Sequence, residues 1–127
     1  MEAKKKIRVL VVDDSVVARE IIAKGLAQDE RIEVVAKAVD AFDARNKILT
    51  FRPDVMTCDI EMPKMDGIEF LRRLLPQYPL PVIVVSSVSY AVFDALNAGA
   101  VDFVSKPNLG SPEQMETFLH QLREKIK

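Results

Sequence analysis

The chain has 127 residues, 49% of them hydrophobic, so it is long enough to fold around one core and too apolar for intrinsic disorder. Its 18 basic and 19 acidic residues give a net charge of −1, which argues against broad binding to nucleic acid. The single cysteine, Cys58, excludes an internal disulfide and fits a reducing compartment. No apolar run is long enough to cross a bilayer, so we expect no membrane insertion and interpret the chain as a mature cytoplasmic sequence.

Short β-branched runs alternate with amphipathic helical patterns along the whole chain. These runs are mostly apolar and do not alternate in polarity, which is typical of strands that are covered on both faces in a parallel sheet. Ser15 is expected to cap the first helix, and Ser111 followed by Pro112 is expected to start the last one. The predicted strands are residues 7–12, 32–36, 55–58, 82–86 and 101–104.

The helical patterns place apolar residues on one side of each predicted helix. Five strand–helix units in this length predict a three-layer α/β domain with right-handed crossovers, and an open doubly wound sheet rather than a barrel, which needs eight units. The expected buried positions are Val92, Ala95, Leu96 and Gly99 in the fourth helix, and Met115, Phe118, Leu119, Leu122 and Ile126 in the last.

Polar residues follow four of the predicted strands. Asp13 and Asp14 follow the first strand, Asp59 the third, Ser86 ends the fourth and Lys106 comes shortly after the fifth. Because ligands bind beyond the carboxyl ends of strands in open α/β sheets, we expect these groups to converge at one edge.

Three carboxylates at close range repel one another unless a cation offsets their charge. Mg²⁺ prefers oxygen ligands and is commonly bound by one or two carboxylates together with water and phosphate. Mg²⁺ and Lys106 together would balance three aspartates. This charge arrangement suits phosphoryl transfer to a carboxylate nucleophile.

These residues match a known family, because the sequence resembles the receiver domain of two-component response regulators over essentially its whole length. The resemblance implies a flavodoxin-like (βα)5 fold, a five-stranded parallel sheet in the order 2-1-3-4-5, and one receiver domain over residues 1–127. The motifs that carry it are Val11-Val12-Asp13-Asp14-Ser15, Asp59-Ile60-Glu61-Met62-Pro63 with Met65-Asp66-Gly67, Val85-Ser86-Ser87 and Ser105-Lys106-Pro107.

The resemblance also assigns roles to the acidic residues. It implies that Asp59 is the phospho-acceptor, and that the domain catalyses its own phosphorylation and dephosphorylation. Asp13 and Asp14 are implied to hold Mg²⁺, with Asp59 and the main-chain carbonyl of Glu61 as further ligands.

Three further positions are implied to respond to the phosphoryl group. Ser86 corresponds to the switch hydroxyl, Lys106 to its ion-pair partner and Phe103 to the aromatic switch residue. The bond between Lys106 and Pro107 corresponds to a cis peptide in the family.

A narrower resemblance is to the receiver of chemotaxis protein-glutamate methylesterases of the CheB type. It implies a chemotaxis histidine kinase as phosphodonor, and a C-terminal methylesterase domain that the unphosphorylated receiver covers. The chain contains no Gly-x-Ser-x-Gly motif, so we do not expect the esterase chemistry within it. The matching segments are residues 34–36, 44–48, 53–55, 59–63, 81–87 and 99–104.

Other interpretations stay open at this point. Asp13 and Asp14 alone would suit a turn and a helix cap, and Phe103 is balanced between core packing and a switch role. A free-standing regulator that docks to a partner is one alternative, and a Mg²⁺-dependent aspartyl phosphatase is another, although Glu61 stands where such enzymes carry a second aspartate. A flavin binder is disfavoured because the Asp13–Asp14 pair would repel a flavin phosphate.

Overall fold

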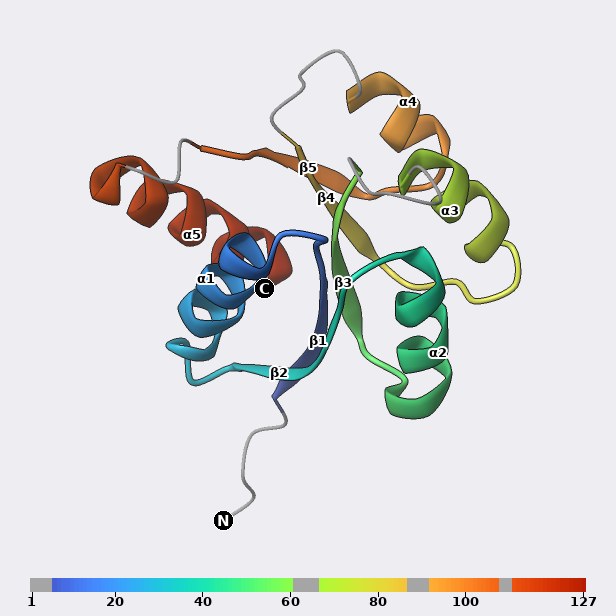
Figure 1. The fold of residues 1–127 in the computed structure, drawn as a ribbon, viewed down its shortest axis with the longest axis horizontal. Coiled ribbons are helices and arrows are strands. Elements are labelled where there is room, and N and C mark those ends of the chain that lie inside the picture. The colour runs from blue at the N-terminus through green and yellow to red at the C-terminus, as the bar shows by residue number, and fades with distance from the viewer. Residues whose placement is uncertain (1–5, 61–66, 87–91, 108–110) are drawn as a thin grey trace.

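The computed structural model describes residues 6–60, 67–86, 92–107 and 111–127. Five strands form one parallel sheet in the order β2-β1-β3-β4-β5, which confirms the predicted doubly wound topology (Figure 1). The strands are β1 (Ile7–Val12), β2 (Ile32–Ala38), β3 (Val55–Asp59), β4 (Val82–Ser86) and β5 (Asp102–Ser105).

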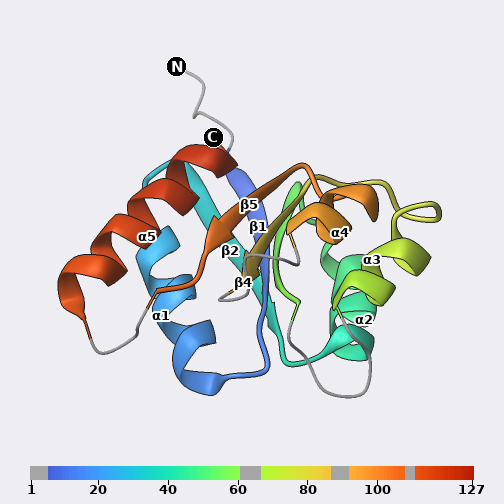
Figure 2. The same cartoon turned by 90° about the horizontal axis from the view of Figure 1, so that it is seen from above.

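The helices cover both faces of the sheet (Figure 2). Helices α1 (Val16–Ala27) and α5 (Pro112–Ile126) lie on one face. Helices α2 (Ala41–Phe51), α3 (Gly67–Leu74) and α4 (Val92–Asn97) lie on the other. Along the described ranges, no helix is both long and apolar enough to cross a membrane.

The five predicted strands are confirmed, but the bounds of three of them are wrong. The ladder of β2 continues to Lys37 and Ala38, because they pair with Val11 and Val12 of β1. Strand β3 includes Asp59, and β5 runs one residue later than expected because Ser105 pairs with Ser86. A change to polar residues does not mark the end of a strand, because backbone hydrogen bonding continues through polar residues.

The expected helix starts at the two serines are also confirmed. The Ser15 hydroxyl accepts a hydrogen bond from the Ala18 amide at 3.2 Å, and the Ser111 hydroxyl accepts one from the Gln114 amide at 3.3 Å. The α5 stripe is confirmed as well, since its expected residues are buried or pack against the core.

The expected stripe of α4 is partly wrong. Ala95 is buried, but Leu96 is 44% exposed and Gly99 lies beyond the helix with a φ of 115°. The amide of Gly99 bonds the carbonyl of Leu96, and the amide of Ala100 bonds the carbonyl of Ala95. This is the Schellman pattern, which needs a left-handed residue after the last turn, so Gly99 ends the helix instead of packing on it.

The core consists of two layers, one on each side of the sheet. Alternate strand residues point to opposite faces, so Val9 and Val11 pack with α1 and α5, whereas Leu10 and Val12 pack with α2, α3 and α4. Cys58 is buried in the second layer, as a small apolar residue would be. The sheet is therefore fixed from both sides, and its carboxyl edge remains for polar groups.

Candidate metal and phosphoryl site

The carboxyl edge of the sheet gathers the polar residues that follow the strands. Asp13 comes directly after β1, Asp59 and Ser86 are the last residues of β3 and β4, and Lys106 directly follows β5. Asp13 and Ser86 are 0% exposed and Asp59 is 3% exposed. Since carboxylates are almost never buried without partners, their burial here indicates a site rather than a solvated surface.

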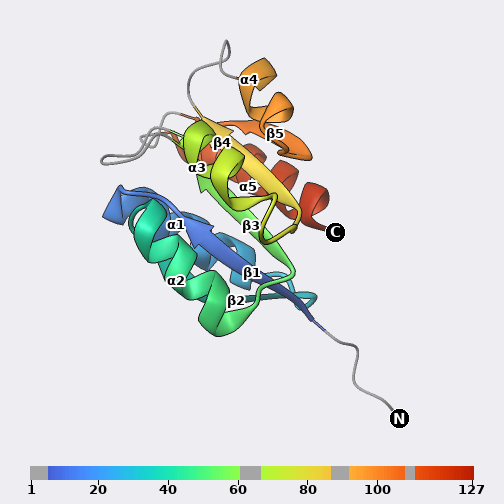
Figure 3. The ribbon, with the colours of Figure 1, turned by 90° about the vertical axis from the view of Figure 1, so that its right-hand side faces the viewer.

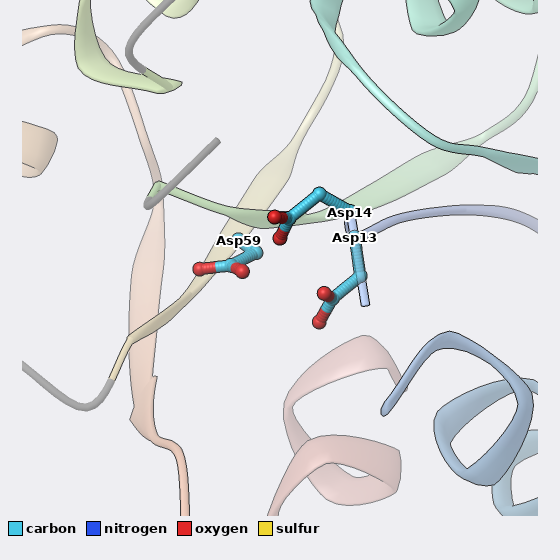
Figure 4. Close-up of side chains that lie close together, drawn as sticks. All are labelled: Asp13, Asp14 and Asp59. Carbon is cyan, nitrogen blue, oxygen red and sulfur yellow. The ribbon is translucent and has the colours of Figure 1, made fainter. Parts of the chain in front are cut away.

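Asp13, Asp14 and Asp59 converge at this edge (Figure 4). Each offers one carboxylate oxygen, and the three oxygens lie within 4.8 Å of one another. Oxygens that share one Mg²⁺ at about 2.1 Å are at most about 4.2 Å apart, so small side-chain rotations would suffice to bind the ion. Asp14 is the exposed member and opens the group to solvent. The donor set therefore fits a hard divalent cation.

Asp13 is held in place from several directions. Its Oδ1 accepts the amide of Ser15 at 2.9 Å, and its Oδ2 accepts the ammonium of Lys106 at 2.9 Å. Its own amide donates to the carbonyl of Ala38, and its carbonyl accepts a guanidinium N–H of Arg19 at 2.9 Å. The turn that carries the acidic pair is thus tied to β2 and to the first turns of α1.

Lys106 bridges the two buried carboxylates. Its ammonium lies 2.9 Å from Asp13 Oδ2 and 3.3 Å from Asp59 Oδ2, and its side chain is 16% exposed. Burial alone lowers the pKa of Lys106, but the hydrogen bond to Asp13 and the charges of Asp59 and Asp13 outweigh it, so the pKa lies above its ordinary value. The side chain therefore stays cationic at neutral pH.

The structure brings together most of the residues that the sequence singled out. The Ser86 carbonyl accepts the amide of Lys106 at 2.9 Å, which places the serine next to the lysine at the sheet edge. Phe103 is half-buried and packs against the core layer of α2, α3 and α4. Glu61 lies outside the described residues.

One expectation about this edge is wrong. None of the described residues is joined by a cis peptide bond, so the bond between Lys106 and Pro107 is trans. The trans form is the one that such bonds favour, by about 0.5–1 kcal/mol.

Two residues of the site were not found by reasoning from charge and spacing. No sequence pattern points to Arg19 as part of the site, since an arginine in a helix four residues after its cap is ordinarily solvated. Gly67 was noted only as part of a motif. A Cβ atom on Gly67 would lie 2.5 Å from the Cα of Ile60, the residue after Asp59, so only glycine allows α3 to start this close to the acidic edge.

Comparison with known proteins places the chain in a family and finds solved structures with the same fold. The sequence model of the response regulator receiver domain matches residues 9–119, and the chain therefore belongs to this family. The crystal structure of the response regulator domain of Thermotoga maritima CheB is similar, with a TM-score of 0.88 at 38% identity over 96% of this chain and 94% of that one.

A curated relative and a second solved structure are also similar to the chain. Protein-glutamate methylesterase/protein-glutamine glutaminase 2 of Syntrophomonas wolfei subsp. wolfei is 57% identical over 123 residues, covering 97% of this chain. These residues are 36% of that protein, so the chain spans about a third of its length. A chain in the crystal structure of the P1 domain of CheA3 in complex with CheY6 from R. sphaeroides matches with a TM-score of 0.77 at 29% identity, over 95% of this chain and 97% of that one.

Proposed function

We propose that this receiver domain accepts a phosphoryl group on Asp59 from the phosphohistidine of a kinase, with Mg²⁺ held by Asp13, Asp14 and Asp59. The observation that carries the proposal is the contact of the buried Asp59 with the Lys106 ammonium at 3.3 Å, inside the acidic group of three. Asp59 is thereby a carboxylate nucleophile beside a fixed cation, as phosphoryl transfer to an aspartate requires.

The charges at the site explain how the acceptor is prepared. Three carboxylates carry three negative charges, and Lys106 offsets only one of them. A bound Mg²⁺ would supply the remaining neutralisation and polarise the phosphoryl oxygens. Asp13 keeps its orientation through the Ser15 amide, and Lys106 offers its N–H groups to the incoming oxygens.

The phosphorylated domain would then favour a second conformation. An aspartyl phosphate adds about two negative charges. Ser86 ends the strand that pairs with the acceptor strand, and the side chain of Lys106 contacts Asp59. Both would be drawn toward the phosphoryl group, and Phe103 on β5 would follow as the switch residue. The shift occurs only to the extent that the phosphoryl group binds one conformation better than the other.

The relatives suggest what the switch controls. The S. wolfei relative is a protein-glutamate methylesterase/protein-glutamine glutaminase, and this chain corresponds to 36% of it. We therefore propose that the domain regulates a methylesterase region in a cytoplasmic chemotaxis pathway. A free-standing regulator remains the alternative, and the coding sequence beyond residue 127 distinguishes the two.

A chemotaxis kinase is the proposed donor. Val16 and Val17 are 63% and 59% exposed in the first turn of α1, directly after Asp14 and Ser15. Exposed apolar side chains beside an acceptor suit docking of a partner domain. The similarity to the complex of CheA3 P1 with CheY6 supports a donor of this class.

The assignment of Asp59 is tested by phosphorylation with acetyl phosphate and Mg²⁺, followed by mass spectrometry of the acid-labile product. Asp59→Asn should abolish the label. Asp54→Asn is the matched control, because exposed Asp54 lies just before the other end of β3 and an asparagine can still accept the Arg8 amide. Label that persists on Asp59→Asn, or that requires Asp54, refutes the proposal.

A further inference from the structure

Helices α2 and α3 lie on the sheet face opposite to α1 and α5, which is the face turned toward the viewer in Figure 3. Residues of these two helices line an apolar groove between them. It has a volume of about 250 Å³, and Phe42 and Phe70 contribute rings to its lining. A second hollow of about 220 Å³ adjoins it, and Gln77 lines both. The second hollow includes Leu80, which lies just before β4, so this surface extends away from the carboxyl edge that holds Asp59.

Large apolar side chains along this surface are left open to solvent. Phe42 is 52% exposed, Leu49 is 42% exposed and Tyr78 is 38% exposed. All three line one of the two hollows. Apolar side chains gathered along a concave surface mark an interaction site more often than scattered ones do.

The charge of the surface indicates what it binds. Arg45, Arg52 and Arg73 line the hollows, and neither lining contains an acidic residue. Over residues 41–52 and 67–74 the sequence carries five basic and two acidic residues, although the whole chain has a net charge of −1. The positive charge is thus concentrated here, and Glu69 offsets part of it by pairing with Arg73 at 2.9 Å.

We propose that the groove between α2 and α3 docks an acidic amphipathic segment of a partner protein, whose apolar side chains enter the groove while its carboxylates pair with Arg45, Arg52 and Arg73. Helix-in-groove recognition uses such apolar anchors, and complementary charge adds specificity and speeds association. A second copy of this chain fits less well, because a symmetric contact would place arginines against arginines.

The probe for this docking is a synthetic helical peptide with leucines on one face and glutamates on the other. NMR shift mapping on the isotope-labelled chain should place its binding at the amides of Arg45, Arg73 and Gln77, with an affinity that falls as salt rises. A peptide with lysines in place of the glutamates should not bind. A variant peptide with serines in place of the leucines should lose most of its affinity.

Two variants of the protein make the test specific. Arg45→Glu should weaken binding about tenfold, through loss of one ion pair and gain of a repulsion. Lys24→Glu makes the same charge change at an exposed position of α1, on the other face, and should leave binding unchanged. Both should unfold in urea as cooperatively as the parent and keep its amide NMR spectrum away from the substituted residue, which shows that they fold.

Several results would overturn the docking proposal. They are equal binding of the lysine peptide, shifts that map to α4, β5 and α5 or to the acidic edge, and equal weakening by Lys24→Glu. Concentration-dependent self-association through Phe42 and Leu49, or binding of an oligonucleotide to the same arginines in preference to the peptide, would overturn it as well. None of these outcomes bears on the phosphorylation of Asp59, so the two proposals fail separately.

Discussion

Helices α1 and α5 on one face of the sheet are joined by direct polar contacts, whereas α2 and α3 on the other face meet across a groove. Arg123 of α5 donates to the carbonyl of Gly25 in α1 at 3.1 Å, and Lys127 reaches Asp29 at 2.7 Å. The leucine at 119 packs so closely on Gly25 that a Cβ atom there would lie 2.6 Å from it.

In the described parts of α2 and α3, the ion pairs between side chains join residues of one helix instead. Lys47 pairs with Asp43 inside α2, and Arg73 pairs with Glu69 inside α3. This difference suggests that the two faces of the sheet have different roles. We call the face of α1 and α5 the clamped face, because polar contacts join these two helices. The start of α1 holds Asp13 in place, so the acidic pair is attached to a rigid part of the fold. The face of α2 and α3 carries the groove that we propose as a docking site.

The largest expected effect comes from truncating one leucine on each face. Leu122→Ala in α5 should cost about 3–5 kcal/mol of unfolding free energy, because Leu122 is 0% exposed in a closed layer and its cavity stays empty. Leu74→Ala in α3 should cost about 2–3 kcal/mol, because Leu74 lines the groove and its surroundings can relax. Urea unfolding measures both, and equal or reversed costs would contradict the contrast between the faces.

The two helical glycines give a second comparison. In Gly67→Ala the new Cβ meets backbone, the Cα of Ile60 at 2.5 Å, so α3 must move and we expect a loss of about 1–3 kcal/mol together with slower phosphorylation of Asp59. In Gly25→Ala the Cβ meets the flexible end of Leu119. Helix propensity favours alanine by about 1 kcal/mol, so stability should change little and phosphorylation should not change. Urea unfolding and acetyl phosphate labelling provide the readouts, and the idea fails if both variants behave alike.

The fold could be predicted from the sequence because its signals are local. Unalternating apolar runs indicate buried parallel strands, and the serines at 15 and 111 mark helix starts. Boundaries were harder, since Lys37 and Ser105 continue their ladders although they are polar. The position of Gly99 at a helix end depends on hydrogen bonds of Ala100, which a helical repeat does not reveal.

The candidate site could be predicted where residues stand at strand ends. Asp13, Asp59 and Lys106 converge because parallel strands end at one edge. Arg19 could not be found this way, since its bond to the Asp13 carbonyl depends on the direction in which α1 leaves the turn after β1. Nor does any sequence pattern place Arg45 in the groove with Arg73, or Arg52 in the adjoining hollow with Tyr78, because these approaches are set by the packing of the folded chain.

The clamped face should also carry the kinase contact, at the exposed start of α1. Val17→Gln should lower the rate of phosphotransfer from a chemotaxis kinase roughly fivefold to tenfold, because part of the apolar contact that Val17 would bury against the kinase is lost. Labelling by acetyl phosphate should stay unchanged, because it needs no kinase. Val101→Gln is the matched control, because Val101 is 61% exposed just before β5, at the amino edge of the sheet. Stopped-flow or quenched transfer assays measure the rates. If the Val101 variant loses as much as the Val17 variant, α1 is not the docking helix.

The smallest expected effect tests the clamp between α1 and α5 through pH. The hydrogen bond from Lys127, followed by the amide of Arg31, lowers the pKa of Asp29 from 3.8 to about 2. Because the folded pKa is depressed, this stabilisation is present above the ordinary pKa and is lost as pH falls from 3.8 through about 2.

Lys127→Met should raise the pKa of Asp29 and lower the free energy of unfolding slightly at neutral pH. The difference in stability between this variant and the parent should shrink in acid. NMR titration of the Asp29 carboxyl and urea unfolding at several pH values measure both quantities, with Lys24→Met as the control for loss of a charge from α1. An Asp29 pKa that stays at about 2 in the Lys127 variant would show that the Arg31 amide alone holds it, and that the ion pair adds nothing to the clamp.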